Sequence, residues 1–432
     1  MLINYVLFFK EIKMRRALCI LFVVLTAVTI IGCRRQQTGP VTLRVAFWDQ
    51  NQAPGIEKVL GEFTAETGIR TRIEVTPWGD YWTSLEASAT GGTLPDVFWM
   101  NTNEIQRYMS AGLLLDLTDR INRSSIADMG NFPTEIANIY HFRGRQYGIP
   151  KDIDTIALWY NKTHFQEAGV PLPTDNWTWD DLNSAARRLR NQAAGRYGIV
   201  FTPGESQTGY WNFIYANNGY VIETPGRKKS GYDDPRTIEA MEFVISFIRD
   251  GVAPPLEMVA ETDKMALMQS GIVSMATFGS WMLGTFARSD YFLQNCDVVM
   301  LPVGRTGTRA TIYNGLAWTT AANTSHPEEA WKLLEFLSSE RAHRRLAEEG
   351  VALSAFTGSA DPFFRQFSAW NASAYLRMLP FGIMRPYSIN TGAWEYMGVQ
   401  LLNEAFGLRR PVADVLREIA QRMNQMLADE FL

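Results

Sequence analysis

Aromatic side chains stand beside carboxylates or carboxamides at the ends of several predicted strands. Trp48 and Asp49 follow the first of these strands, Trp78 and Asp80 lie after the second, and Asn101 follows the third. An aromatic ring offers a flat apolar face, whereas amides and carboxylates offer planar hydrogen-bonding groups. This combination suits a cavity for a ligand that presents both C–H surface and hydroxyl groups.

The chain lacks the short motifs of common catalytic and metal sites. It contains no G-x-S-x-G, H-E-x-x-H or P-loop sequence. Its four histidines are scattered and no C-x-x-C occurs, so we expect neither a metal nor a cofactor. Acidic residues are plentiful, which leaves open a secreted carbohydrate-active enzyme that works with paired carboxylates.

Strands and helices alternate in the part of the chain that carries these residues. Residues 41–47 and 69–75 alternate between apolar and polar, as strands do, and 96–100 form a third strand-like run. Helical spacing over 59–63 points to a helix that ends at Gly68, and a second helix is expected over 82–90. This β-α-β-α-β series predicts a parallel sheet with right-handed crossovers.

Helix starts are marked more clearly in the second half of the chain. Asp234 followed by Pro235 predicts a capped helix that ends at Gly251. Thr178 and Ser325 are each expected to begin a helix by capping its first turn.

The amino-terminal segment is typical of a signal peptide. Basic residues 15–16 precede an apolar run over 18–31, and Cys33 follows a small residue. The run of about 14 residues is shorter than the ~20 that a membrane-spanning helix needs. Residues 30–33 resemble the lipobox of bacterial lipoproteins, which implies lipidation of Cys33 after removal of 1–32. Residues 33–40 would then be a tether; the alternative is an ordinary signal peptide.

Charge and cysteine content restrict the partners and the stabilising bonds. Residues 1–32 hold four basic residues and one acidic residue, so their removal changes the net charge from −4 to −7. A negative chain is not suited to nucleic acid. Only Cys296 would remain besides Cys33, so no intramolecular disulfide is expected, and about 400 residues can form two stable domains by burial alone.

Several segments in one order resemble the family 1 extracellular solute-binding proteins, the group that contains the maltose-binding protein. None of these segments is specific alone, but together they extend over nearly all of the chain after Cys33. They lie at residues 43–48, 66–69, 94–97, 111–117, 147–150, 158–162, 177–182, 275–281, 314–315 and 326–331.

The resemblance implies an α/β, two-lobed periplasmic-binding-protein fold of class II. Each lobe would be a mainly parallel sheet flanked by helices, with ligands bound beyond the carboxyl ends of strands. The expected amino-terminal lobe comprises 41–150 and 281–318, and the carboxy-terminal lobe 155–275 and 325–432. Three chain crossings are expected, near 150–155, 275–280 and 314–322.

The resemblance also implies a function. It is that of a non-catalytic, exported, monomeric binding component of a carbohydrate ABC importer, with a mono- or oligosaccharide as ligand and the membrane permease subunits as partners. A lipid on Cys33 would anchor it at the cell surface or the periplasmic face of a membrane. A binder of another small solute, such as a polyol or glycerol phosphate, remains an alternative.

Candidate ligand contacts follow from the loop positions and from the resemblance. Each has a structural alternative, because tryptophans of large proteins are commonly core residues, Asn occupies turns, and carboxylates can pair at a hinge. The candidates are Trp48, Asp49, Gln50, Asp80, Asn101, Asp152, Asp154, Trp211, Trp281, Asn314 and Trp394.

Overall fold

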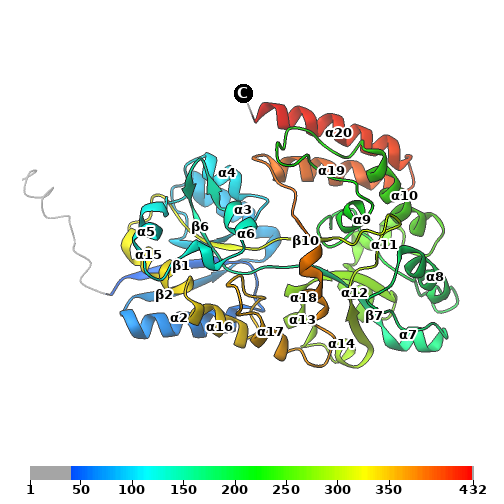
Figure 1. Ribbon diagram of the computed structural model, residues 1–432, viewed down its shortest axis with the longest axis horizontal. Coiled ribbons are helices and arrows are strands. Elements are labelled where there is room, and N and C mark those ends of the chain that lie inside the picture. Colours follow the sequence, from blue (N-terminus) through cyan, green and yellow to red (C-terminus); the bar gives the residue numbers. More distant parts are fainter. Residues whose placement is uncertain (1–39, 431–432) are drawn as a thin grey trace, which may run out of the picture. The chain divides into compact units, whose positions relative to one another are not determined.

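Two β-sheets organise the chain, each with its own layer of helices (Figure 1). The computed structural model describes residues 40–430. Cys33 and the predicted signal peptide lie outside these residues. No helix within 40–430 is both long enough and apolar enough to cross a membrane.

The first sheet has five strands, and its centre is formed by segments far apart in the sequence. β1 and β3 pair in parallel, with Val45 opposite Val97. β11 is antiparallel to both of its neighbours, β3 and β6. The order is β2 (Arg70–Val75), β1 (Thr42–Phe47), β3 (Val97–Met100), β11 (Ala317–Thr320) and β6 (Gly148–Pro150).

The helices that cover the first sheet come from two separate parts of the chain, residues 53–139 and residues 327–348. α16 packs beside α2, and ion pairs at 2.9 Å (Arg345–Glu62) and 2.5 Å (Lys58–Glu349) join the two segments. Figure 1 shows these helices, blue and gold, running side by side. The helices of this lobe are α2 (Ala53–Thr67), α3 (Trp78–Thr90), α4 (Ile105–Ser110), α5 (Thr118–Arg123), α6 (Thr134–Ile139), α15 (Pro327–Leu337) and α16 (Glu340–Glu348), with a hairpin of β4 (His141–Phe142) and β5 (Arg145–Gln146).

The second sheet is antiparallel, with β8 (Met275–Gly279) and β9 (Cys296–Val299) on either side of β7 (Ile156–Asn161). The expectation of a mainly parallel sheet is therefore wrong for this lobe. All six residues of β7 are buried, as in a central strand that is covered on both faces. The backbone of residues 197–200 bonds to the other edge of β8, where Val200 N donates to Met275 O at 3.2 Å.

A large apolar core fills the second lobe between this sheet and its helices. α19 and α20 pack against each other, and α10 packs against both. The helices are α7 (Lys162–Glu167), α8 (Trp179–Leu189), α9 (Tyr210–Ala216), α10 (Pro235–Arg249), α11 (Leu256–Glu261), α12 (Lys264–Gln269), α13 (Leu283–Phe286), α14 (Asp290–Asn295), α18 (Ala374–Met378), α19 (Thr391–Phe406) and α20 (Val412–Asp429). β10 (Thr311–Tyr313) pairs with β12 (Gly382–Met384), and α17 (Asp361–Arg365) packs on α16.

Two of the three predicted helix starts are confirmed. Thr178 and Asp181 form a capping box, and the Asp234 side chain accepts a hydrogen bond from Arg236 N. The prediction for Ser325 is wrong, because the residue that caps α15 is His326, which makes no side-chain capping bond. Ser325 lies one position too early to reach the first turn.

The chain passes between the two sheets three times, but not at all the expected places. Residues 151–155 link β6 to β7, and residues 314–316 link β10 to β11. The third link follows α16 and ends before α18, which packs on β7. The expected crossing at 275–280 is wrong, because β8 and β9 both pair with β7 and the chain between them stays with the second sheet.

The predicted lobe boundaries change accordingly. The stretch 281–313 belongs to the second lobe, whereas 281–318 was assigned to the first. Helices α15 and α16, within 325–432, pack on β11 and α2 of the first lobe. Both errors concern segments whose lobe is decided by long-range pairing.

Candidate functional site

A cavity of about 920 Å³ lies among residues of both lobes and of the segments that connect them. The first lobe contributes the loops after β1 and β3 and the start of α3. The second lobe contributes residues 204–208, the start of α12, residues 278–282 and the start of α19. The cavity is therefore lined mainly by loops and helix starts that the strands and helices hold in place, as is common for binding sites.

One wall of the cavity is a cluster of aromatic rings around Trp48. The centroid of the Trp48 ring lies 5.1 Å from that of Trp78, 5.6 Å from that of Trp82 and 5.0 Å from that of Trp99. Trp78 and Trp82 are one turn apart on α3, so they face the same side of the helix. The Trp99 ring is fully buried, whereas Trp48, Trp78 and Trp82 line the cavity.

Carboxylates on the first crossing lie at the base of the cavity. Asp152 accepts from Lys151 Nζ at 2.6 Å and from Leu316 N at 2.7 Å, which ties the first crossing to the second. The Lys151 ammonium also lies 4.2 Å from the centroid of the Trp99 ring. Asp154 accepts from Gln207 Nε2 at 2.9 Å.

Gln207 joins this base to the polar groups of the second lobe. Its Oε1 accepts from Arg385 Nε at 3.0 Å and from Asn314 Nδ2 at 3.4 Å. Arg385 Nη2 donates to Glu395 at 2.6 Å, while Arg385 Nη1 is buried without a partner. The guanidinium is thus fixed on two sides, with one donor left over.

A second pair of charges from the second lobe lines the same cavity. Lys264, which is buried, pairs with Glu205, and its Nζ donates to Thr208 Oγ1 at 2.8 Å. Burial lowers the pKa of Lys264, and the Glu205 carboxylate opposes that change. Both cations that line the cavity, Lys264 and Arg385, are therefore paired with carboxylates.

Burial also acts on the acids of the cavity. Desolvation, reinforced by the neighbouring Asp152 carboxylate, raises the pKa of Asp154 well above its ordinary value. Desolvation likewise raises the pKa of Glu395, although Arg385 opposes it. Removing these groups from water favours their neutral forms.

Trp281 contributes an aromatic face from the second lobe. It lies in a 3-10 turn after β8, and its ring covers the backbone of Gly279 so closely that a Cβ there would lie 1.9 Å from ring atom Cζ3. Glycine at 279 therefore makes room for the indole. The ring is partly buried and lines the cavity.

The comparison with protein families decides the family. A profile described as bacterial extracellular solute-binding protein matches residues 49–344, which is more than half of the chain. This chain belongs to the bacterial extracellular solute-binding proteins.

Relatives and solved structures agree with this membership. A putative binding protein of Brucella abortus is 28% identical over 302 residues, 69% of this chain and 72% of the relative. A multiple sugar-binding protein of Streptococcus mutans is 21% identical over 343 residues, which is 74% of this chain and 78% of the relative. An ABC substrate-binding protein of Listeria monocytogenes, solved in complex with cycloalternan, has a TM-score of 0.83 at 20% identity, covering 90% of this chain and 99% of that chain.

The two-lobed fold predicted from the sequence is confirmed by these structures. The structure also brings many of the predicted contact residues of this solute-binding protein to one cavity. Those that line it are Trp48, Asp49, Asn101, Asp152, Asp154, Trp281 and Asn314.

Four predicted residues lie elsewhere. Gln50 and Asp80 are exposed and do not line the cavity. Trp211 and Trp394 belong to the apolar core, with ring centroids 6.1 Å apart. Their indole N–H groups donate to Tyr232 at 2.9 Å and to Ser388 at 3.0 Å, which satisfies both rings inside the protein.

Sequence reasoning missed several residues of the cavity. Trp82 could have been found, since it begins the helix predicted over 82–90 and follows Trp78 by four positions; in the structure α3 already begins at Trp78. The polar groups had no local signal, because long-range packing places them together: Gln207, Lys264, Arg385 and Glu395.

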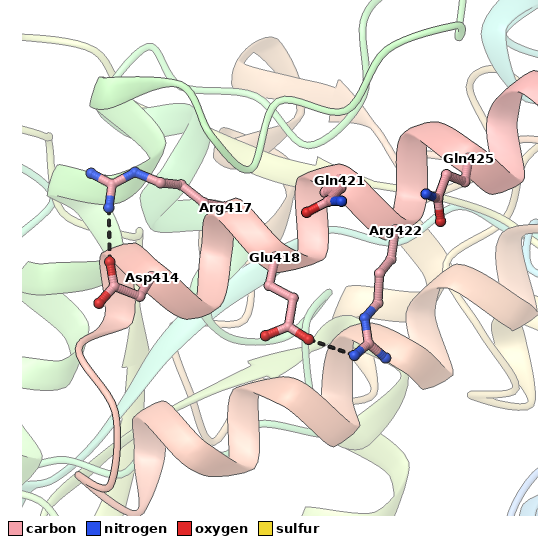
Figure 2. Close-up of a pocket in the computed structure, with 6 residues that line it drawn as sticks. All are labelled: Asp414, Arg417, Glu418, Gln421, Arg422 and Gln425. Carbon is pink, nitrogen blue, oxygen red and sulfur yellow. Dashed lines mark hydrogen bonds and ion pairs between the residues drawn. The ribbon is translucent and has the colours of Figure 1, made fainter.

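A different hollow lies over one face of α20 (Figure 2). All its residues come from that single helix, and they pair with one another: Arg417 with Asp414 at 2.9 Å and Arg422 with Glu418 at 2.5 Å. A one-sided, self-paired surface cannot enclose a solute. Within residues 40–430 there is also no group of three or more side chains suited to hold a metal ion.

Proposed function

We propose that this solute-binding protein captures a neutral sugar in the cavity between its two lobes. The observation that carries the proposal is the pairing of aromatic faces, Trp48 and Trp281, with buried amides and carboxylates in one cavity. Sugars need both kinds of surface, since their C–H faces pack on rings while their hydroxyls donate and accept hydrogen bonds. The sugar-binding relatives named above support the same ligand class.

The charge pattern favours a neutral ligand over a phosphorylated one. An anion such as glycerol phosphate needs cationic donors that are free to pair with it. Lys264 and Arg385 already pair with Glu205 and Glu395. A phosphate would have to compete with these carboxylates, and Glu395, whose side chain is 14% exposed, would lose its partner in a largely desolvated place.

The proposed contacts include those predicted from the sequence that line the cavity. The aromatic contacts are Trp48 and Trp281. The polar contacts are Asp49, Asn101, Asp152, Asp154 and Asn314, to which the structure adds Gln207 and Arg385.

Binding would couple to movement of the lobes about the three crossings. Arg288 of the second lobe donates to the backbone of Asn51 in the first lobe at 2.9 Å, and Glu104 lies beside Gly392, where a Cβ would be 2.6 Å from its Oε1. Such contacts exist only while the lobes are together. A ligand that bridges both half-sites shifts the population toward the closed form.

We also propose that the protein does not cleave its ligand. A glycosidase needs one carboxyl group to give or take a proton and a second to act on the sugar or on water. Asp152 is held by Lys151 and Leu316 N, and Asp154 by Gln207. An oligosaccharide incubated with the protein should be recovered intact.

In the cell, the protein would be exported and anchored by lipid on Cys33, with a monomer delivering sugar to the permease subunits of an ABC importer. The family membership and the amino-terminal sequence support this arrangement. The negative charge and the absence of a basic surface motif argue against nucleic acid as a partner.

A thermal-shift screen against sugars, polyols and glycerol phosphate tests the proposal. A ligand at about 100 times its Kd should add roughly 2.7 kcal/mol to the free energy of unfolding. We expect a shift with at least one sugar, reduced in Trp281→Ala. A shift with glycerol phosphate but with no sugar would overturn the proposal.

A further inference from the structure

Apolar aromatic surface is exposed at the cavity although most of the large hydrophobic residues are buried. Three aromatic residues within 40–430 are exposed: Trp78 at 49%, Phe381 at 37% and Tyr396 at 70%. Trp78 and Tyr396 both line the cavity, the first from α3 and the second from α19. Exposed aromatic rings at a cavity indicate a surface that a ligand covers.

The aromatic cluster of the first lobe extends from the core to the solvent. Trp99 is fully buried, Trp48 is partly buried against it, and Trp78 is half exposed against Trp48. The centroid distances along this series are 5.0 Å and 5.1 Å, so the rings are in continuous contact. A ligand that packs on Trp48 can therefore continue along the same apolar surface onto Trp78.

The hydrogen-bonding groups are distributed in the opposite way. Asp154, Asn314 and Arg385 are all buried, at 8%, 4% and 4% exposure. They are joined through Gln207, and Arg385 keeps one donor without a partner. The deep end of the cavity can thus satisfy the hydroxyls of one ring, whereas its outer end offers mainly aromatic faces.

The cavity volume fits a ligand larger than one ring. Its 920 Å³ lies near the upper end of the range of about 300–1,000 Å³ in which proteins enclose drug-sized ligands. A single sugar ring bound among the buried polar groups would leave Trp78 and Tyr396 uncovered.

We infer that the ligand is an oligosaccharide, with an inner ring held by Asp154, Asn314 and Arg385 and an outer ring stacked on Trp78 and Tyr396. This inference rests on the proposed function, because it assumes that the cavity binds sugars. Beyond that function, the protein would distinguish sugars by their number of rings, through contacts of the outer ring with Trp78 and Tyr396.

Calorimetric titration with matched mono-, di- and trisaccharides of glucose, galactose, mannose and xylose tests this inference. In the wild type, we expect the best oligosaccharide to bind at least about tenfold more tightly than its own monosaccharide. Trp78→Ala should weaken oligosaccharide binding by about tenfold and leave monosaccharide binding within about twofold, since only the outer ring loses its stacking surface. Trp78→Phe should keep most of the oligosaccharide affinity.

Phe381→Ala is the matched control, because Phe381 is an exposed aromatic residue that does not line the cavity. It should bind every sugar as the wild type does, and a melting curve for each variant verifies folding. If a monosaccharide binds as tightly as every longer sugar, or if Trp78→Ala weakens all sugars equally, the inference is overturned and the proposed function stands. If the wild type binds none of these sugars, the proposed function is overturned as well.

Discussion

Asn103 Nδ2 donates a hydrogen bond to Glu395 Oε2 at 2.6 Å. Asn103 follows β3 in the first lobe, and Glu395 lies in the first half of α19 in the second lobe. Glu395 also accepts from Arg385, so the bond connects the first lobe directly to the polar network of the cavity. Separation of the lobes must break it.

Loss of this bond should weaken ligand binding. Asn103→Ala removes the donor, so closure loses roughly 1 kcal/mol and affinity falls about fivefold. Calorimetric titration measures the change, and small-angle scattering should show a more open unliganded protein. Asn138→Ala, on the exposed side of α6, is the control. Unchanged affinity in Asn103→Ala would show that the bond does not distinguish the open from the closed form.

Two tryptophans that follow similar sequence patterns should respond differently to truncation. Trp281 lines the cavity, so Trp281→Ala should reduce ligand binding by about 1.5–3 kcal/mol with a smaller loss of stability. Trp394 is 1% exposed within the core, so Trp394→Ala should lower the free energy of unfolding by about 3–5 kcal/mol and leave the affinity of the folded protein nearly unchanged. Denaturant melts combined with titration separate these effects; the reverse pattern would contradict our placement of the two rings.

The buried Asp154 carboxyl should make stability depend on pH. Burial and Asp152 raise its pKa in the folded protein well above the ordinary 3.8, against the opposing influence of Arg385, Gln207 and Lys151. A group whose pKa is higher in the folded than in the unfolded protein stabilises the fold at any pH below its pKa in the unfolded protein. This stabilisation is lost as the pH rises through its pKa in the folded protein.

Asp154→Asn should therefore remove that loss and unfold at higher denaturant concentration than the wild type at pH 7. Below about pH 4 the two proteins should differ less, because the wild-type carboxyl is then neutral in both states. Urea melts over a pH series measure this difference. Glu57→Gln, on the exposed side of α2, should keep the wild-type profile. A variant that is less stable than the wild type at pH 7 would show that the ionised carboxylate is the favoured form.

Glycine at position 315 allows two chain crossings to run side by side. A Cβ at Gly315 would lie 2.2 Å from the backbone oxygen of Asp152, which cannot move aside. Gly315→Ala should therefore lower the free energy of unfolding by about 1–3 kcal/mol. Gly61→Ala, in the middle of α2 with no atom near the added methyl group, should instead stabilise by about 0.5–1 kcal/mol. Thermal melts of both variants test the contrast, and equal melting temperatures would refute it.

The proposed anchor can be tested in cells. If Cys33 carries the lipid, labelled fatty acid should enter the wild-type protein but not Cys33→Ser, and the variant should appear in the soluble fraction or as unprocessed precursor. Cys296→Ser, at a buried position of β9, should still incorporate label. Membrane retention of Cys33→Ser without acylation of the wild type would disprove lipid anchoring.

Local sequence patterns predicted several elements of both lobes. The β-α-β-α-β series, the left-handed Gly68 after α2 and the capping box of Thr178 each depend on residues close together in the chain. Asp152 and Asp154 were expected as ligand contacts from the resemblance to the solute-binding proteins, and the structure places both at the cavity, directly after β6.

The errors concern properties that local sequence does not determine. Trp281 and Trp394 each lie two residues after a glycine, so their local sequences look alike. Trp394 is nevertheless a core residue, because its helix, α19, packs against α20. The pairing of β9 with β7, like the return of α15 and α16 to the first lobe, joins segments more than one hundred residues apart. The polar network around Gln207 assembles from four segments that are each more than fifty residues apart in the chain.

The position of β11 restricts how the first lobe can form. Within residues 40–430, the one strand that pairs with β6 (residues 148–150) in its sheet is β11, at residues 317–320. The second-lobe segment from β7 to β10 must therefore be synthesised before β6 can pair, and the ends of the intervening chain must close a long loop. Contacts of such sequence separation slow folding. Fragments that end before residue 317 should retain an incomplete sheet with β3 as an exposed edge, and such edges promote aggregation.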